Sequence, residues 1–155
     1  MSDLEYKPRG LYFEEIEVGK SVVTTGRTIT EGDIVSFAGL SGDFNQLHVD
    51  AVYAEAGEFG QRVAHGLLVV SITTGLIVQT GLMEGTVHAF RELEWKFSRP
   101  VFIGDTIHAD LTVTETKPLP RLGGGNVTAK VTVYNQHNQV VQRGTMVLLV
   151  RGKPA

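Results

Sequence analysis

The sequence predicts an α+β domain in which an antiparallel sheet surrounds one buried helix. The first observation is a long apolar segment, residues 66–80, whose hydrophobic side chains would occupy nearly every face of a helix. The second is a set of four long segments, rich in β-branched residues and separated by turn residues, in the second half of the chain. These segments are 86–97, 105–117, 126–135 and 140–151. Because a helix that is apolar all round must be covered by other elements, we expect the sheet to wrap around it.

Shorter elements are predicted ahead of the long helix. Residues 12–19 are expected to be extended and to end in a turn, and residues 21–29 alternate Val and Thr as a strand does. Thr30 is placed as an N-cap, with Asp33 in the capping-box position, for a helix that ends between Gly39 and Gly42.

The boundaries of the remaining elements come from capping and turn residues. Asp50 is a cap for a second short helix over 51–58, and Gly81 suits the position just after the long helix ends. The triplet Gly123–Gly125 is expected to form a flexible hairpin loop, because no Lys-Ser/Thr pair follows it as in a phosphate-binding loop. Residues 1–10 are expected to be a loose arm on a single domain that spans 1–155.

Composition excludes several classes of function. The net charge of −3 provides no basic surface for nucleic acid. The chain has no cysteine, which rules out disulfides, thiolate catalysis and cysteine-based zinc sites. The amino terminus lacks the apolar core of a secretory signal, and the longest apolar stretch is too short and too polar to span a bilayer. We therefore expect a soluble, cytoplasmic protein with neither nucleic acid nor a membrane as partner.

The run Ser41–His48 carries the strongest indication of chemistry. It places Asp43 and His48 five residues apart on a segment that Gly42 and Asn45 mark as a loop. A carboxylate and an imidazole that converge on one water can add that water to a polarised double bond, or remove it. An isolated Asp after Gly is more often an Asx-turn residue. Here the spacing from Asp43 to His48, together with a glycine at the start of a predicted helix, favours a catalytic role for Asp43.

Gly66 is that helix-start glycine. A helix N-terminus offers free backbone N–H groups and the positive end of the helix dipole, which suit a developing oxyanion. A residue without a side chain also allows a ligand to approach the backbone closely. Gly66 is therefore a candidate for stabilising negative charge on a substrate oxygen.

These motifs resemble those of the MaoC-like dehydratase family, which includes the (R)-specific enoyl-CoA hydratases. The family loop reads Ser/Thr-Gly-Asp-x-Asn-Pro-aliphatic-His, and residues 41–48 match it except that Gln46 replaces the proline. Two further segments, His65-Gly66-Leu67 and Arg99-Pro100-Val101 with Gly104-Asp105-Thr106, are similar to the family's central-helix start and to its strand–turn–strand signature. The resemblance extends from about Phe13 to Val150.

The resemblance implies a hotdog fold, in which a curved antiparallel sheet wraps a long central helix. It implies reversible addition of water to a trans-2-enoyl thioester, with an (R)-3-hydroxyacyl thioester as product. Asp43 is the candidate base and His48 the candidate acid and water-orienting group, and the sequence leaves the opposite assignment open. Gly66 and Asn45 are placed at the substrate-binding site, Asn45 as a hydrogen-bonding loop residue rather than a chemical participant.

The other histidines have simpler explanations. His65 is expected to fix the turn before the long helix by hydrogen bonding. The remaining three have no carboxylate or histidine at ligand spacing on a shared face: His88, His108 and His137. No metal site and no cofactor are therefore predicted, and His88 and His108 are expected to be ordinary strand residues.

The expected partners are an acyl-CoA or acyl-carrier thioester and other copies of this chain. Edge strands and the apolar helix favour a homodimer or a higher even oligomer. Five basic residues are available for the phosphates of coenzyme A, and spacing does not select among them: Arg62, Arg91, Lys96, Arg99 and Arg121. Two alternative functions remain open at this stage, a hotdog acyl-CoA thioesterase and a non-catalytic subunit that binds acyl thioesters.

Overall fold

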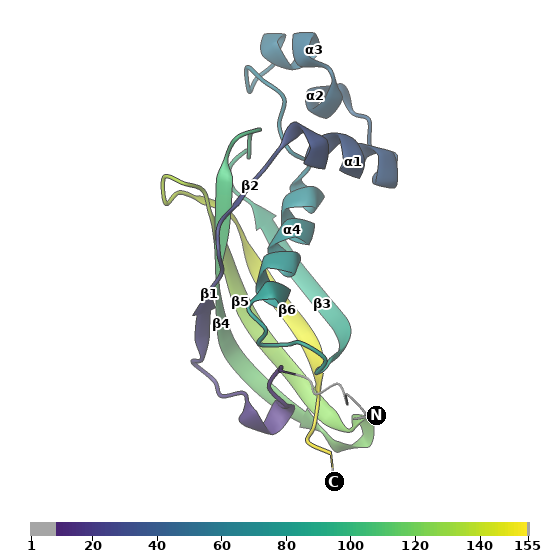
Figure 1. Ribbon diagram of the computed structural model, residues 1–155, viewed down its shortest axis with the longest axis vertical. Helices are drawn as coiled ribbons and strands as arrows, with labels where there is room; N and C mark the ends of the chain where they lie inside the picture. The colour runs from purple at the N-terminus through teal and green to yellow at the C-terminus, as the bar shows by residue number, and fades with distance from the viewer. Residues whose placement is uncertain (1–8, 155) are drawn as a thin grey trace, which may run out of the picture.

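The computed structural model describes residues 9–154 and shows one curved sheet around one long helix (Figure 1). The chain begins with the 3₁₀ turn η1 (Phe13–Glu15) and the short strands β1 (Ser21–Val23) and β2 (Arg27–Thr28). The helices follow: α1 (Glu31–Ser41), α2 (Gln46–Val49), α3 (Ala51–Ala56) and α4 (Gly66–Gln79). The second half contains β3 (Val87–Phe97), β4 (Thr106–Leu119), the 3₁₀ turn η2 (Pro120–Leu122), β5 (Gly124–Tyr134) and β6 (Val140–Arg151).

The strands form an antiparallel sheet with the order β1-β4-β5-β6-β3, and β2 also pairs with β4. The helix α4 lies along the concave side of this sheet, while α1, α2 and α3 project beyond one end of it (Figure 1). This arrangement confirms the predicted α+β hotdog fold. The segment between α3 and α4 connects the projecting helices to the start of α4.

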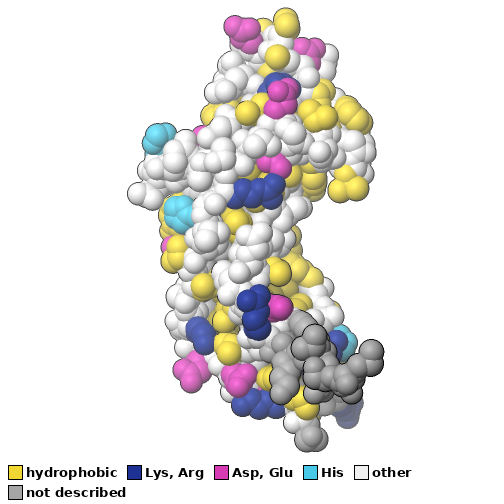
Figure 2. All heavy atoms as spheres, in the orientation of Figure 1, with side chains coloured by type: hydrophobic (Ala, Val, Ile, Leu, Met, Phe, Trp, Pro, Cys, Tyr) yellow, Lys and Arg dark blue, Asp and Glu magenta, His cyan; other side chains and the backbone are white. Residues whose placement is uncertain are grey.

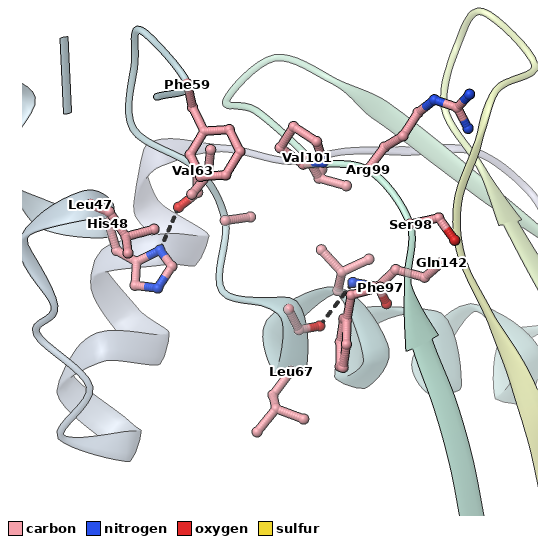
Figure 3. Close-up of a pocket in the computed structure, with 14 residues that line it drawn as sticks. Leu47, His48, Phe59, Val63, Leu67, Phe97, Ser98, Arg99, Val101 and Gln142 are labelled. Atoms are coloured by element: carbon pink, nitrogen blue, oxygen red, sulfur yellow. Dashed lines mark hydrogen bonds between the residues drawn. The ribbon is translucent and has the colours of Figure 1, made fainter. Parts of the chain in front are cut away.

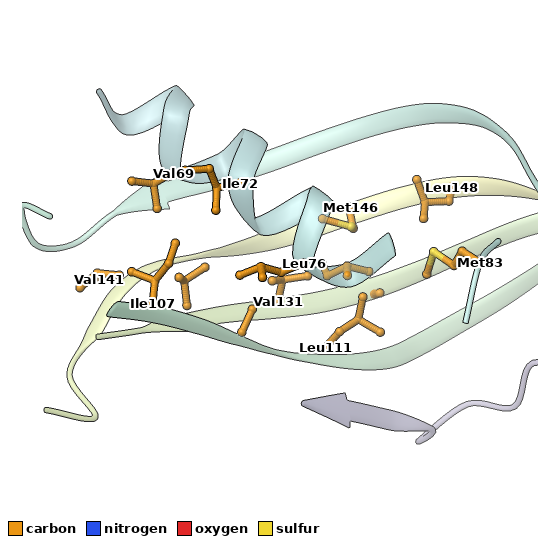
Figure 4. Close-up of a cluster of buried hydrophobic side chains, with 14 of the residues drawn as sticks. Val69, Ile72, Leu76, Met83, Ile107, Leu111, Val131, Val141, Met146 and Leu148 are labelled. Carbon is orange, nitrogen blue, oxygen red and sulfur yellow. The ribbon is translucent and has the colours of Figure 1, made fainter. Parts of the chain in front are cut away.

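The core lies between α4 and the concave face of the sheet (Figure 4). Alternate residues of β4 and β5 are buried, as expected for strands with one face against a core. Leu111, Val131 and Met146 come from three neighbouring strands and are almost fully buried; Val69 and Leu76 of α4 pack in the same cluster. Burial of such side chains contributes about 1.5–3 kcal/mol each, so this layer is the main source of stability.

One stripe of α4 is not covered, contrary to the expectation that the helix is enclosed on all sides. Leu67, Ser71, Gly75 and Val78 recur at helical spacing and are exposed. Further hydrophobic side chains are exposed on α1, where Leu40 is 85% accessible, and on the edge strand β3. Figure 2 shows exposed hydrophobic side chains over the projecting helices.

Local capping signals were predicted well. The Thr30 amide donates to Asp33 Oδ2 at 2.9 Å and the Asp33 amide donates to Thr30 Oγ1 at 3.2 Å, which is the predicted capping box. The helix that follows ends at Ser41, within the predicted interval. Asp50 caps α3 through a bond from the Tyr53 amide, and Gly81 has the positive φ of 79° expected just after α4 ends.

Two predictions for the amino-terminal half were wrong. The segment 12–19 contains η1, because the Glu15 carboxylate accepts from the Tyr12 amide and closes a turn. The strand predicted over 21–29 is divided into β1 and β2. Between them the Thr24 hydroxyl accepts from the Ala109 amide at 2.9 Å, so a side chain replaces a backbone partner and interrupts the ladder.

The glycine triplet also differs from its prediction. Gly124 and Gly125 belong to β5 and pair with β4, and only Gly123, with φ of 66°, has a turn conformation. A Cβ at Gly125 would clash with the ring of Phe13, so this glycine allows close packing rather than loop flexibility.

Most of the predicted arm, residues 1–8, lies outside the described residues. Gly10 is buried, and its amide donates to the Glu84 carbonyl at 3.0 Å.

Within residues 9–154, none of the helices has the length and apolar character needed to cross a membrane.

Candidate active site

The loop that carries Asp43 is shaped by its neighbours. Gly42 ends α1 in the left-handed conformation, with φ of 78°, and its amide donates to the Ala38 carbonyl. The Ser41 hydroxyl accepts from the Asp43 amide at 3.2 Å. These bonds turn the chain sharply at the end of α1, so Asp43 begins a new segment directed toward α4.

His48 lies on α2, a short helix that the sequence analysis treated as loop. Asn45 is its N-cap, with Oδ1 accepting from the Leu47 amide at 3.4 Å. The helix brings the His48 side chain into the interior, where it is 8% exposed. Asn45 is exposed at the helix terminus, where it makes this capping contact, and it is not among the residues that line the pocket described below.

The tautomer of His48 follows from its hydrogen bond. Nδ1 lies 2.7 Å from the carbonyl oxygen of Val63, and a carbonyl can only accept. Nδ1 therefore carries a proton, and Nε2 is the nitrogen that remains for chemistry. A backbone partner of this kind also fixes the orientation of the ring.

His65 also donates a hydrogen bond to a backbone carbonyl, in this case to the loop that carries Asp43. Its Nε2 lies 2.9 Å from the backbone carbonyl oxygen of Asp43 and therefore donates to it. The His65 ring is 2% exposed and stacks on His48, with centroids 3.8 Å apart and an interplanar angle of 26°. The prediction that His65 only fixes the turn before α4 missed this link to the Asp43 loop.

Asp43 completes a compact cluster. One side-chain ligand atom from each of Asp43, His48 and His65 lies within 4.8 Å of the others. Asp43 Oδ1 also accepts from the Asn45 amide at 3.2 Å, so the Asx-turn contact is present together with the clustering. His48 Nδ1 and His65 Nε2 both donate to backbone carbonyls, so His48 Nε2 and His65 Nδ1 are the ring nitrogens left for other partners. This arrangement can hold a water between the carboxylate and an imidazole.

A pocket of about 580 Å³ opens beside His48 (Figure 3). Its size lies within the range of small-molecule sites. The lining is mainly apolar and comes from α2, the α3–α4 connection, the start of α4, and the end of β3 with the segment after it. It includes Leu47, Phe59, Val63, Leu67, Phe97 and Val101. Gly66 and His48 both line it, whereas Asp43 lies outside the lining on the exposed side of the cluster.

Gly66 is the first residue of α4, as predicted, but its lack of a side chain has a different reason. A Cβ at Gly66 would lie 2.7 Å from the ring of Phe97, so the missing side chain makes room for Phe97 rather than for a ligand. No side chain caps the helix at His65, so its first turn keeps the backbone donors of a helix N-terminus.

Gln142 is a site residue that the sequence analysis missed. It lines the pocket, is 2% exposed, and its Nε2 donates to the Gly66 carbonyl at 3.1 Å. Its Oε1 accepts from the Trp95 indole at 2.9 Å. A buried amide with two bonds fixes the start of α4 against β3 and β6. The strand β6 also contains Arg143 and Thr145, so a polar residue at position 142 had no distinctive sequence signal.

The fold and the cluster define a hotdog protein with an Asp/His centre beside an apolar pocket. Residues 14–135 match the family described as MaoC like domain. An (R)-specific enoyl-CoA hydratase of Rhodospirillum rubrum is 40% identical over 107 residues, which are 69% of this chain and 72% of that protein. The chain belongs to the MaoC-like dehydratase family.

Two further proteins are similar. Protein MaoC of Klebsiella aerogenes is 45% identical over 101 residues, which are 65% of this chain but only 30% of that relative. The solved structure of an R-hydratase from Pseudomonas aeruginosa has a TM-score of 0.78 at 31% identity, covering 93% of this chain and 88% of that one.

Proposed function

We propose that this chain is a hydro-lyase that adds water reversibly to a trans-2-enoyl thioester, with an (R)-3-hydroxyacyl thioester as product. The observation that carries the proposal is the convergence of Asp43 and His48, from a loop and a separate helix, beside a pocket that also exposes the start of α4. The names of the two hydratases described above support the same reaction class. Acyl-CoA is the proposed substrate form.

The proposed reaction uses one water held between the Asp43 carboxylate and His48 Nε2. Asp43 accepts a proton from this water as its oxygen attacks Cβ, and His48 delivers a proton to Cα. The step uses a His48 ring protonated on both nitrogens: Nδ1–H donates to the Val63 carbonyl, and the proton on Nε2 is the one delivered to Cα. The proton that Asp43 took from water returns to Nε2 when the product leaves, which regenerates both groups. Positioned acid–base groups contribute about 10²–10⁴-fold in rate. Transfer of both groups from one side gives syn addition.

The start of α4 is the proposed oxyanion site. Negative charge develops on the thioester oxygen when water attacks Cβ, and the Gly66 amide at the helix N-terminus is the candidate donor. Gln142 holds the Gly66 carbonyl and so fixes the orientation of this peptide. Asn45 supports the site indirectly by capping the helix that carries His48.

A homodimer is proposed for the working enzyme. Besides the exposed stripe of α4, the edge strand β3 has Leu93 and Phe97 exposed, and Asp43 is exposed shortly after the end of α1. A second copy that covers this face would bury the apolar stripe and shield the water between Asp43 and His48. Val78→Lys on α4 is expected to produce monomers in light scattering. A wild-type chain that is monomeric at assay concentrations would refute the dimer.

The test of the reaction is loss of the conjugated absorbance of crotonyl-CoA, with chiral analysis of the product. Asp43→Asn and His48→Ala are each expected to lower kcat by about 10²–10⁴-fold. Asp50→Asn is the matched control, because Asn also caps a helix and Asp50 lies outside the cluster.

Three results would contradict the proposal. Release of free thiol without hydration would indicate a thioesterase. Binding of crotonyl-CoA without any turnover would indicate a non-catalytic subunit. Hydration that survives both substitutions would show that other residues carry the reaction.

A further inference from the structure

The pocket beside His48 has two chemically different ends. His48 lies at one end and Arg99 at the other, with the guanidinium of Arg99 directed away from the imidazole (Figure 3). Apolar side chains, including Phe97 and Val101, lie between them. A ligand that reaches both ends would have a reactive group near His48, an uncharged middle and an anion near Arg99.

The backbone of Arg99 is held in place. The amides of Ser98 and Arg99 both donate to the Val141 carbonyl, at 2.8 and 3.0 Å. Arg99 Nη1 donates to the Val140 carbonyl at 2.8 Å, which directs the side chain along the pocket rim. A guanidinium has five N–H donors, so this single bond leaves most of the planar fork for a ligand.

Charge pairing distinguishes Arg99 from other arginines near the site. Arg62 is paired with Glu31 at 2.5 Å and Arg27 with Asp33 at 2.6 Å. Among residues 9–154, no carboxylate forms an ion pair with Arg99. Of the five basic candidates named from the sequence, Arg99 alone lines this pocket. An unpaired guanidinium at a pocket mouth is suited to bind phosphate through two parallel bonds.

We propose that Arg99 binds the phosphate at the distal end of a pantetheine arm, the group that coenzyme A and an acyl carrier protein share. This inference rests on the proposed function, because it places the thioester at the His48 end of the pocket. The arm itself is uncharged and extended, so it can occupy the apolar middle, and its phosphate is the first anion beyond the thioester. Arg99 thereby recognises the carrier and takes no part in the chemistry.

The test compares crotonyl thioesters that differ in their phosphates. Crotonyl-pantetheine has none, crotonyl-4′-phosphopantetheine has one, and crotonyl-CoA has further phosphates beyond it. Arg99→Gln is expected to raise KM about tenfold for the two phosphorylated thioesters, because it removes charge-assisted hydrogen bonds to the phosphate. It is expected to leave KM for crotonyl-pantetheine and every kcat unchanged. Arg121→Gln, the same charge change on η2 far from the pocket, is the control.

Three outcomes would overturn the inference. If Arg99→Gln raises KM equally for crotonyl-pantetheine, Arg99 acts by holding the Val140 segment. If it raises KM for crotonyl-CoA alone, the contact is to a different phosphate. An unchanged KM with all three thioesters would exclude a binding role. Crotonyl loaded on an acyl carrier protein distinguishes the two sources, because wild-type kcat/KM shows which carrier is preferred.

Binding of saturated thioesters separates this inference from the proposed reaction. Butyryl-4′-phosphopantetheine and butyryl-pantetheine cannot be hydrated, and calorimetry measures their affinities directly. If the wild-type chain hydrates nothing but Arg99→Gln weakens only the phosphorylated ligand, the phosphate site stands and the hydratase proposal fails. If hydration is normal and Arg99→Gln binds butyryl-4′-phosphopantetheine as tightly as the wild-type chain does, the phosphate site fails alone.

Discussion

The rings of His48 and His65 stack 3.8 Å apart, and each donates a hydrogen bond to the segment that carries the other. His48 Nδ1–H donates to Val63, two residues before His65. His65 Nε2–H donates to Asp43, five residues before His48. The two imidazoles therefore join the Asp43 loop and the start of α4 reciprocally. Only His48 also lines the pocket, so His65 is a positioning residue in this arrangement.

Substitutions at His65 separate its hydrogen bond from its ring. His65→Gln keeps an N–H donor near the position of Nε2, whereas His65→Phe keeps a ring and loses the donor. His65→Phe is expected to lower kcat by at least about tenfold with little change in KM, because a displaced general base loses much of its effect. His65→Gln is expected to retain most of kcat. Steady-state assays with crotonyl-CoA measure both.

A different order of kcat between His65→Phe and His65→Gln would assign His65 a different role. If His65→Gln is as impaired as His65→Phe while both unfold at the wild-type temperature, the ring itself is needed and the bond to Asp43 is not. A pH–rate profile gives a second readout, because a purely structural residue lowers the whole profile without changing its shape.

Gly66 and Phe97 are predicted to be energetically coupled. A methyl group at Gly66 would lie 2.7 Å from the Phe97 ring, which is too close for a carbon contact. The Phe97 ring is 55% exposed and can rotate aside, so Gly66→Ala is expected to destabilise the protein by no more than about 1 kcal/mol. Phe97→Leu provides space, so the double variant should lose less stability than the sum of the two single variants. Urea unfolding of all four proteins measures this cycle, and simple additivity would contradict the predicted clash.

Gln142 connects the pocket to a spectroscopic probe, because Trp95 is the only tryptophan of the chain. Gln142→Leu removes the acceptor for the Trp95 indole and the donor to the Gly66 carbonyl. Loss of these bonds at a buried position is expected to cost about 1–3 kcal/mol of unfolding free energy. The folded variant should also show a shifted Trp95 emission spectrum and a lower kcat. Unchanged emission would mean that the indole keeps its environment without Gln142.

The sequence was sufficient for elements whose signals are local. The apolar run of α4, the alternation in β4 and β5, and the Thr30–Asp33 capping box all depend on neighbouring residues, and each was predicted within a few positions. The Asp43 and His48 pair was predicted from spacing in one loop, and the structure brings these side chains together.

The missed features depend on contacts between distant segments. The helix α2 has four residues, too few for a helical period to appear. The His65–Asp43 bond spans 22 residues and the Gln142–Gly66 bond spans 76, so neither leaves a local pattern. Gly66 was recognised, but the ring that requires a glycine there lies on β3, and only the folded chain shows that contact.

The environment of Glu15 predicts how the free energy of unfolding changes at acid pH. The hydrogen bond from the Tyr12 amide, followed by the Lys153 ammonium at 3.0 Å, lowers the pKa of Glu15 below its ordinary value of 4.5. A carboxyl whose pKa is lower in the folded protein stabilises the fold above its unfolded pKa and loses this contribution as pH falls through the folded value. The difference in unfolding free energy between wild type and Glu15→Gln should therefore be largest near neutral pH and shrink below about pH 4.5. Glu17→Gln, an exposed change two residues away, is the control. A Glu15→Gln difference that stays constant with pH would show that the carboxylate charge does not contribute.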